Sequence, residues 1–279
     1  MSNNTPKNKN KTLVIGSMGK TGRRVVEKLT KLGWPVQGAS RSSNPKFDWN
    51  DSTTWKPALK GIKSAYISFQ PDLAIPGSVP IIQRFTETAV AQGVEQLVLL
   101  SGRGEVEAQL CEEVVIRSGV DWTIARASWF NQNFDEGNFL EAVKAGHVAL
   151  PAGDIGEPFV DADDIADVAV AALTQEGHSR KIYEVTGPRL LTFSQAVEEI
   201  ARATGRTITF EKIPMDAYAA ALSQYGLPAD VISLITYLFT EVLDGRNESI
   251  TDGVEKALGR KPKDFSEFAK KAAAEGVWK

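Results

Sequence analysis

The stretch Thr12–Leu29, which reads TLVIGSMGKTGRRVVEKL, decides the fold of this chain. Strand-forming residues lead into Gly16, Gly19 and Gly22 follow at three-residue steps, and apolar residues then recur with helical spacing. A strand, a glycine turn and a helix suit a dinucleotide pyrophosphate, because backbone N–H groups and the helix N-terminus can both approach the phosphates. An ordinary glycine-rich turn is the alternative, but its place on the first strand favours cofactor binding.

Each glycine of the turn is expected to have its own role. Gly16 allows a tight exit from the strand, Gly19 leaves the phosphate path free of a side chain, and Gly22 lets the helix lie close to the sheet. The predicted phosphate-binding residues are Gly16, Ser17, Met18, Gly19, Lys20, Thr21 and Gly22.

A second predicted strand, Val36–Ala39, ends in Ser40-Arg41-Ser42-Ser43. Folds that bind NAD place an acidic residue about 20 positions beyond the glycine turn, where it binds the adenosine ribose, whereas an arginine there suits a 2′-phosphate. The chain has Arg41 and no acid at this point, and a guanidinium can hold a phosphate through paired hydrogen bonds. The sequence therefore predicts NADP(H) as the cofactor, with a solvated loop arginine as the alternative.

Strands and helices then alternate as in an α/β fold with a doubly wound parallel sheet. Phe47–Trp49 is predicted as a short edge strand, and Ser64–Phe69 and Gln96–Leu100 as the next strands. Ligands of open α/β sheets bind at the carboxyl ends of the strands, so the residues there should border the cofactor. Asp48 is expected to meet the adenine amino group. The other predicted cofactor-binding residues are Trp49, Ser68, Phe69, Gln70, Ser101 and Gly102.

Composition excludes several classes of protein. The formal net charge of -3 gives no electrostatic footprint for nucleic acid or an anionic membrane surface. No apolar run approaches the roughly 18 residues of a membrane span. The polar leader, residues 1–11, lacks the apolar core of a secretory signal and is predicted to be disordered. The expected compartment is the cytoplasm, and the expected partner is a small molecule.

No metal site is predicted. The single cysteine, Cys111, is expected to be a buried, inert thiol, and the two histidines have no neighbouring zinc ligands. Asp161, Asp163 and Asp164 form an acidic run that could suggest a metal. We interpret Asp161 as a helix cap and the other two as charges that complement the helix dipole.

Four segments, in order, resemble the NmrA-like group of atypical short-chain dehydrogenase/reductases: GSMGKTGRRV, GVEQLVLLSG, SGVDWTIARASWFNQNF and PFVDADDIADVAVAAL. The downstream YEVTGPRLLTFSQAVEEIARATGRTITF is similar to that group's C-terminal part, so the resemblance covers nearly the whole chain after the leader. Within the group the chain most resembles bacterial NAD(P)H:quinone oxidoreductases. The patch SRSSNPKFDWND is similar to fungal festuclavine-type reductases, which reduce an iminium.

The resemblance implies a Rossmann-like domain, NADP(H) as cofactor and a small, mostly helical C-terminal part that faces the substrate. We place the NAD(P)-binding domain at residues 12–150, joined by 158–186, and the smaller part at 187–279, with a blurred boundary. An apolar stripe between Val231 and Val242 is interpreted as core. Part of it could instead cover the substrate or meet a second subunit in a homodimer.

The chain departs from the wider superfamily in its chemistry. Typical short-chain dehydrogenases use Tyr-x-x-x-Lys, in which the lysine lowers the tyrosine pKa so that the tyrosine can donate a proton. No tyrosine here has a lysine four residues on. Hydride transfer to a quinone or an iminium remains possible, because the cofactor carries the chemistry. The alternative is a non-catalytic protein that senses NADP(H).

The substrate is expected to be a small planar acceptor that meets an aromatic surface. The predicted substrate-binding residues are Arg103, Ser128, Trp129, Phe130, Phe134 and Tyr218. The aromatic residues could equally belong to the core. Catalytic residues are not identified by any motif, and Tyr218 is the candidate proton donor because its segment could reach over the site.

Overall fold

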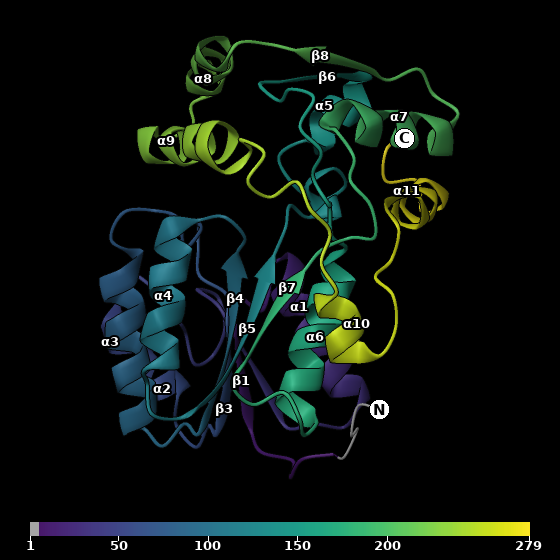
Figure 1. Ribbon diagram of the computed structural model, residues 1–279. Helices are drawn as coiled ribbons and strands as arrows, with labels where there is room; N and C mark the ends of the chain where they lie inside the picture. The colour runs from purple at the N-terminus through teal and green to yellow at the C-terminus, as the bar shows by residue number, and fades with distance from the viewer. Residues whose placement is uncertain (1–5) are drawn as a thin grey trace. The chain divides into compact units, whose positions relative to one another are not determined.

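The computed structural model describes residues 6–279, which divide into two compact units (Figure 1). Unit 1 contains the described chain up to Ala127, together with Ala162–Val185 and Asp252–Arg260. Unit 2 contains Ser128–Asp161, Thr186–Thr251 and Lys261–Lys279. Each unit is therefore built from segments that are far apart in the sequence.

Unit 1 is a parallel sheet covered by helices on both faces. Its strands are β1 (Thr12–Ile15), β2 (Val36–Ala39), β3 (Ser64–Ile67), β4 (Gln96–Gly102), β5 (Asp121–Ala127) and β7 (Lys181–Val185). Its helices are α1 (Lys20–Lys31), the 3₁₀ turn η1 (Ser52–Thr54), α2 (Trp55–Ala58), α3 (Ser78–Ala91), α4 (Val106–Ile116), α6 (Ala162–Thr174) and α10 (Gly253–Leu258). The strand order is β2-β1-β3-β4-β5-β7, with every pair parallel. The predicted doubly wound α/β fold is confirmed.

Alternation along the strands divides the core of unit 1 into two layers. In β1, Leu13 and Ile15 join the buried cluster that includes residues of α3 and α4, whereas Val14 joins the cluster with α1 and α6. Figure 1 shows these two pairs of helices on opposite faces of the sheet. Because both faces are covered, the central strands β1 and β3 are buried along their whole length.

The predicted edge strand Phe47–Trp49 is wrong, since this segment is not part of the sheet. The rings of Phe47 and Trp49 meet edge to face at 4.9 Å and pack on Trp55 and Phe85. Both rings point into the same cluster, so the segment covers one face of the sheet and does not extend its edge. Burial of these large aromatic surfaces outweighs an additional row of strand pairing.

The prediction of a disordered leader is wrong for residues 6–11, and residues 1–5 lie outside the described residues. The Lys7 amide donates to Thr174 O at 2.8 Å, and Lys7 Nζ donates to Ala172 O at 2.9 Å. Lys9 Nζ similarly reaches Leu32 O at 3.2 Å. These carbonyls lie at the C-terminal ends of α6 and α1, where lysine satisfies unpaired acceptors and the helix dipole.

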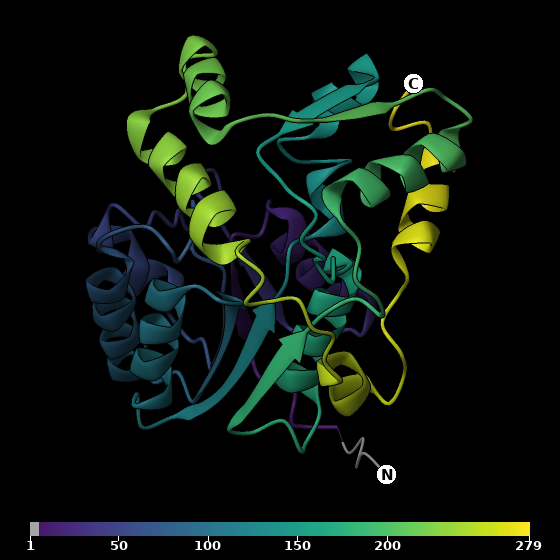
Figure 2. The ribbon, with the colours of Figure 1, turned by 45° about the horizontal axis from the view of Figure 1, so that its top comes forward.

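Unit 2 is mostly helical and has its own aromatic core. Its elements are the 3₁₀ turn η2 (Asn131–Asn133), α5 (Leu140–Ala145), β6 (His147–Leu150), α7 (Phe193–Thr204), β8 (Thr209–Lys212), α8 (Met215–Gln224), α9 (Ala229–Tyr237), the π-helical turn η3 (Leu238–Val242) and α11 (Phe265–Ala274). Strands β6 and β8 form a parallel pair, which can be followed in Figure 2. Ile235, Phe239 and Val242 of the predicted stripe are buried, in agreement with the core interpretation.

The division into units differs from the predicted boundary at residue 150. Val143 and Val148 are fully buried in the aromatic core of unit 2, so the chain joins that unit directly after β5. The segment Asp252–Arg260 returns to unit 1, where Gly253 lies so close to the backbone of Glu184 that a Cβ would collide with it. A six-residue helix such as α10 carries too little periodicity to reveal this return from sequence.

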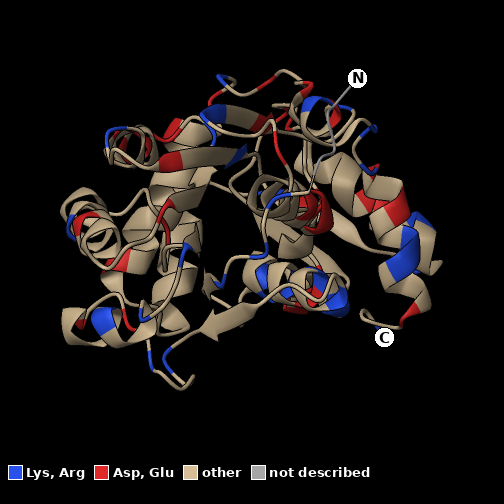
Figure 3. Ribbon diagram, turned by 90° about the horizontal axis from the view of Figure 1, so that it is seen from below, with Lys and Arg blue, Asp and Glu red and all other residues tan. Residues whose placement is uncertain are grey.

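Acidic and basic residues are interspersed on the helices (Figure 3). Arg24 of α1 pairs with Asp163 at 3.2 Å, and Arg260 pairs with Asp164 at 2.7 Å. Within residues 6–279, no group of three possible ligands could hold a metal ion. No helix in the same range combines the length and apolarity that a membrane crossing requires.

Candidate functional site

The glycine turn of unit 1 leads into the N-terminus of α1, which is suited to binding an anion. Gly16 adopts φ +73°, and its amide donates to Ala39 O at 3.0 Å. Gly19 is the N-cap of α1, where no side chain caps the helix, and the first turn contains no acidic residue. The partial positive charge of this helix end is therefore not offset by a carboxylate of its own first turn.

The three glycines meet different constraints. A Cβ at Gly22 would collide with the carbonyl group of Gly16, so glycine at this position lets the start of α1 pack against the preceding turn. A Cβ at Gly19 would lie 3.2 Å from Gly16 O and 3.7 Å from Gln70 Nε2, so it is tight but not excluded. Position 19 is therefore the one where a side chain would extend over the turn without breaking it.

The end of β2 presents a basic side chain. Arg41 is exposed and, within the described part of the chain, forms no hydrogen bond or ion pair. The turn that carries it is held by Ser43 Oγ, which is 2.8 Å from the Ser40 amide. Asp48 is engaged locally, because its Oδ1 accepts from the Asn50 amide at 3.1 Å. Arg41 therefore remains available for a phosphate.

The end of β3 lies beside the glycine turn. A Cβ at Gly16 would lie 3.2 Å from Ser68 Cβ, and Gln70 faces Gly19 as described above. The structure thus brings Ser68 and Gln70 together with the turn. Trp49 and Phe69 are buried, with ring centroids 5.0 Å apart. Both rings belong to the core of unit 1, and their predicted contacts with the cofactor remain predictions.

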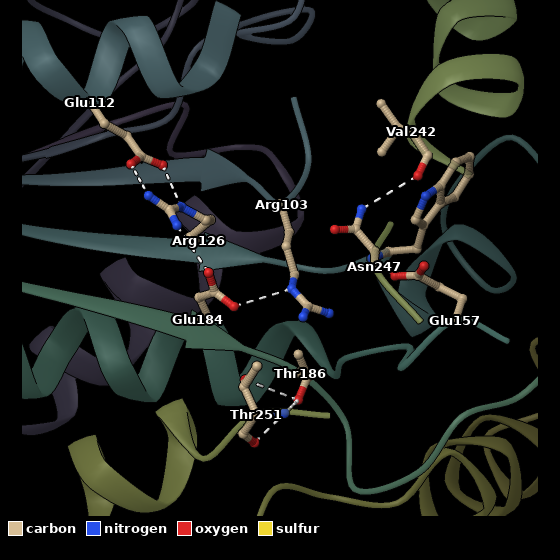
Figure 4. A network of polar contacts seen from close by, with 10 residues as sticks. Arg103, Glu112, Arg126, Glu157, Glu184, Thr186, Val242, Asn247 and Thr251 are labelled. Carbon is tan, nitrogen blue, oxygen red and sulfur yellow. Dashed lines mark hydrogen bonds and ion pairs between the residues drawn. The ribbon is translucent and has the colours of Figure 1, made fainter. Parts of the chain in front are cut away.

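A chain of polar contacts connects β4, α4, β5 and β7 (Figure 4). Ser101 Oγ donates to Glu112 at 2.6 Å, and Arg126 holds the same carboxylate through Nε at 2.9 Å and Nη2 at 2.5 Å. Arg126 Nη1 then reaches Glu184 at 2.9 Å, which also accepts from Arg103 Nε at 3.3 Å. The hydroxyl of Ser101 and one edge of Arg103 are therefore engaged in structural contacts. Their predicted binding roles remain predictions.

Two carboxyl groups at the same sheet edge are not among the predicted site residues. Glu105 follows β4, is 7% exposed, and lies beside Asp72, which follows β3. Burial, followed by the charge of Asp72, raises the pKa of Glu105 well above its usual range. Neither residue belongs to a recognisable motif, so only their proximity in the fold reveals the pair.

The predicted substrate residues of unit 2 separate into surface and core. Phe134 is fully buried against Phe139, Phe159 and Phe265, which favours the core alternative, and its substrate contact remains a prediction. Phe134 packs in the core because Phe265, at the start of α11, lies against its ring. Phe130, four residues earlier, is half-buried and contacts no other aromatic ring among the described residues.

Trp129 and Tyr218 are half-buried in unit 2 and share a neighbour. Both rings contact Phe239, with centroid distances of 5.1 Å for Trp129 and 5.8 Å for Tyr218. Burial raises the pKa of Tyr218, which makes its hydroxyl a weaker acid.

Polar groups at the start of unit 2 were only partly predicted. Ser128 Oγ is buried, and no described residue bonds to it. Asn131, which was missed, is fully buried, and neither atom of its amide group bonds to a described residue. A separate cavity of about 290 Å³ in unit 2, lined in part by Arg206, Lys270 and Trp278, contains none of the predicted site residues.

The parallel sheet, the glycine turn and the uncapped helix N-terminus define a Rossmann-like, nucleotide-dependent class of α/β protein. Comparison with known proteins agrees with this class. The model of the NmrA-like family matches residues 107–269. Agroclavine dehydrogenase of Claviceps fusiformis is 30% identical over 274 residues, covering 92% of this chain and 95% of the relative.

Two solved structures match almost the whole chain. Citrobacter sp. triphenylmethane reductase complexed with NADP(H) gives a TM-score of 0.79 at 16% identity, covering 94% of this chain and 99% of its own. The NADPH-dependent quinone oxidoreductase QOR2 of Escherichia coli, complexed with NADPH, also gives 0.79, at 21% identity, covering 93% and 99%.

The chain belongs to the NmrA-like family and is an oxidoreductase. The resemblance inferred from its motifs is thereby confirmed. The predicted cofactor, NADP(H), agrees with the cofactor named for both matched structures.

Proposed function

We propose that this chain transfers a hydride from NADPH to a small planar acceptor such as a quinone. The proposal rests mainly on the glycine turn, where α1 begins at Gly19 without a side-chain cap or an acidic residue in its first turn. An anionic pyrophosphate would complete this helix end. Arg41, exposed and without a protein partner among the described residues, would bind the 2′-phosphate.

The chemical class of the acceptor is proposed from an aromatic side chain of unit 2. Phe130 is half-buried and free of ring contacts with described residues, so its face is available for stacking on a planar molecule. Quinones suit such a surface because they are flat and mostly apolar. An iminium is the second candidate, since a relative with 30% identity is named agroclavine dehydrogenase, in keeping with the local resemblance to festuclavine-type reductases.

A panel of acceptors tests the proposal. Purified protein is mixed with NADPH and, in turn, quinones, azo dyes, iminium compounds and cationic triphenylmethane dyes, and NADPH oxidation is followed by absorbance. Reduction of quinones is the expected result. Reduction of iminium compounds alone would favour the second candidate. Tight NADPH binding without oxidation by any acceptor would favour a protein that senses NADP(H).

A further inference from the structure

Glu105 directly precedes α4, at the position where a short polar side chain often caps a helix. It is the N-cap residue of α4, yet its side chain accepts no capping hydrogen bond. Helix capping therefore does not explain where this carboxyl group lies.

The carboxyl group is instead turned back over the end of β4. A Cβ on Gly102 would collide with the Glu105 carboxyl atoms, so only glycine at position 102 allows this placement. Gly102 is the last residue of β4, at the carboxyl edge of the sheet where open α/β folds bind their ligands. Glu105 thus lies at the sheet edge predicted to border the cofactor.

The partner of Glu105 is a second carboxyl group. Two neighbouring carboxyl groups can share a hydrogen bond only if one of them carries a proton, and Glu105 lies beside Asp72. Glu105 Oε2 is buried and accepts from no donor among the described residues. The charged groups that act on Glu105 are Asp72, Glu107 and Glu112, all acidic. The surroundings therefore favour a retained proton.

The two members of the pair differ in exposure. Glu105 is 7% exposed, whereas Asp72 is partly accessible to solvent and is fixed by the Ala74 amide, which donates to its Oδ1 at 2.9 Å. A proton lost from the buried member can therefore be replaced through the accessible one.

We propose that Glu105 donates the proton that accompanies hydride transfer and that Asp72 restores it from water. This inference rests on the proposed function. NADPH gives a hydride to the quinone and becomes NADP⁺, while the Glu105 O–H bond breaks and a hydroquinone O–H bond forms. The electron pair of the broken bond stays on the Glu105 carboxylate, and a proton from water then returns to the pair.

Acceptors that differ in charge can distinguish proton donation by Glu105 from a purely structural role of this residue. Reduction of a quinone consumes one hydride and one proton. A cationic triphenylmethane dye needs the hydride alone, because hydride addition to its central carbon already gives the neutral product. Loss of the proton donor should therefore slow the quinone reaction and spare the dye reaction.

The test compares Glu105→Gln with the parent chain, using both acceptors. We expect kcat for quinone to fall at least about 100-fold, in the range of general acid catalysis, while kcat for the dye and the Kd for NADPH stay unchanged. The pH dependence of quinone kcat, which should fall as the pair loses its proton, should disappear in the variant. Glu113→Gln is the matched control, because Glu113 is an exposed residue of α4 paired with Arg117 at 3.1 Å.

Several outcomes would overturn the inference. Equal losses with both acceptors would indicate a structural role for Glu105, and an unchanged quinone rate would exclude proton donation. A thousandfold loss in Tyr218→Phe, with NADPH affinity retained, would make Tyr218 the donor. If the parent chain reduces the dye but not quinones, the donor role fails and hydride transfer stands. If it reduces neither, the proposed function fails as well.

Infrared spectroscopy examines the shared proton without turnover. The parent chain should show a C=O band of a protonated carboxyl group that shifts in D₂O and is absent in Glu105→Gln. Its absence from the parent chain would also overturn the inference.

Discussion

At the scale of single residues, the glycine turn shows that similar residues can be required for different reasons. Gly16 supplies a positive φ, whereas Gly22 supplies room for the backbone of the preceding turn. Gly19 has neither constraint to the same degree. Gly19 is therefore proposed to be required for cofactor binding and not for folding.

We therefore expect Gly19→Val to abolish NADPH binding while leaving the fold intact. Gly22→Ala should instead lower the free energy of unfolding by roughly 1–3 kcal/mol, because its Cβ meets backbone atoms that cannot move aside freely. Circular dichroism with thermal unfolding measures the second effect, and NADPH titration measures the first. Normal NADPH binding by folded Gly19→Val would contradict the phosphate assignment.

Arg41 should determine the choice of cofactor. A charge-assisted contact with the 2′-phosphate is worth about 1.5–3 kcal/mol, so NADPH should bind at least about tenfold more tightly than NADH. Arg41→Ala should remove this preference and leave NADH affinity unchanged. Calorimetric titration of both cofactors measures it, with Arg23→Ala as a comparison on the exposed face of α1. Equal affinities in the parent chain would be incompatible with the assignment.

At the scale of elements, the last helix of unit 2 is held by charge as well as by its apolar face. Asp264 caps α11 through the Ser266 amide at 2.9 Å and receives Arg189 at 2.6 Å through Nε and 2.9 Å through Nη2. The hydrogen bonds from Arg189 hold the pKa of Asp264 well below its ordinary value. A depressed carboxyl pKa stabilises the fold above the unfolded-state pKa, and this contribution is lost as the pH falls towards the folded-state pKa.

Asp264→Asn should keep the cap, since asparagine caps equally well, and lose only the charge. We expect the free energy of unfolding at pH 7 to fall by up to about 1 kcal/mol, because this ion pair is partly exposed. Below about pH 4, the free energy of unfolding should fall less steeply in the variant than in the parent chain. Urea unfolding at several pH values measures both effects, with the exposed Glu275→Gln as control. Identical acid dependence in parent and variant would show that the pair contributes nothing.

At the scale of the whole molecule, unit 1 depends on segments that follow unit 2 residues in the chain. Strand β7 completes the sheet beside β5, and α6 covers one face with Ala166, Ala169 and Leu173. A fragment ending at residue 161 would lack both, so the apolar face formed by Val14 and Val98 would be exposed to water.

We expect that fragment to be unfolded or aggregated, whereas the full chain is folded. Size-exclusion chromatography and circular dichroism distinguish these states. A monomeric fragment with a cooperative thermal transition and NADPH binding would show that the later segments are dispensable for unit 1.

The sequence by itself determined the sheet, the glycine turn and the class of cofactor. These depend on local signals: apolar runs, glycines at fixed spacing, and Arg41 at the end of a strand. Such signals act over a few residues, so they remain readable without the fold.

Only the tertiary structure decided which side chains meet. Phe130 and Phe134 lie in one motif, yet the second is fully buried because distant phenylalanines close around it. Asp72 and Glu105 are separated by 33 positions, and neither is distinguished by its neighbours in sequence. Parallel strands bring their carboxyl ends to one edge, and burial there beside Asp72 raises the pKa of Glu105, which no local pattern can encode.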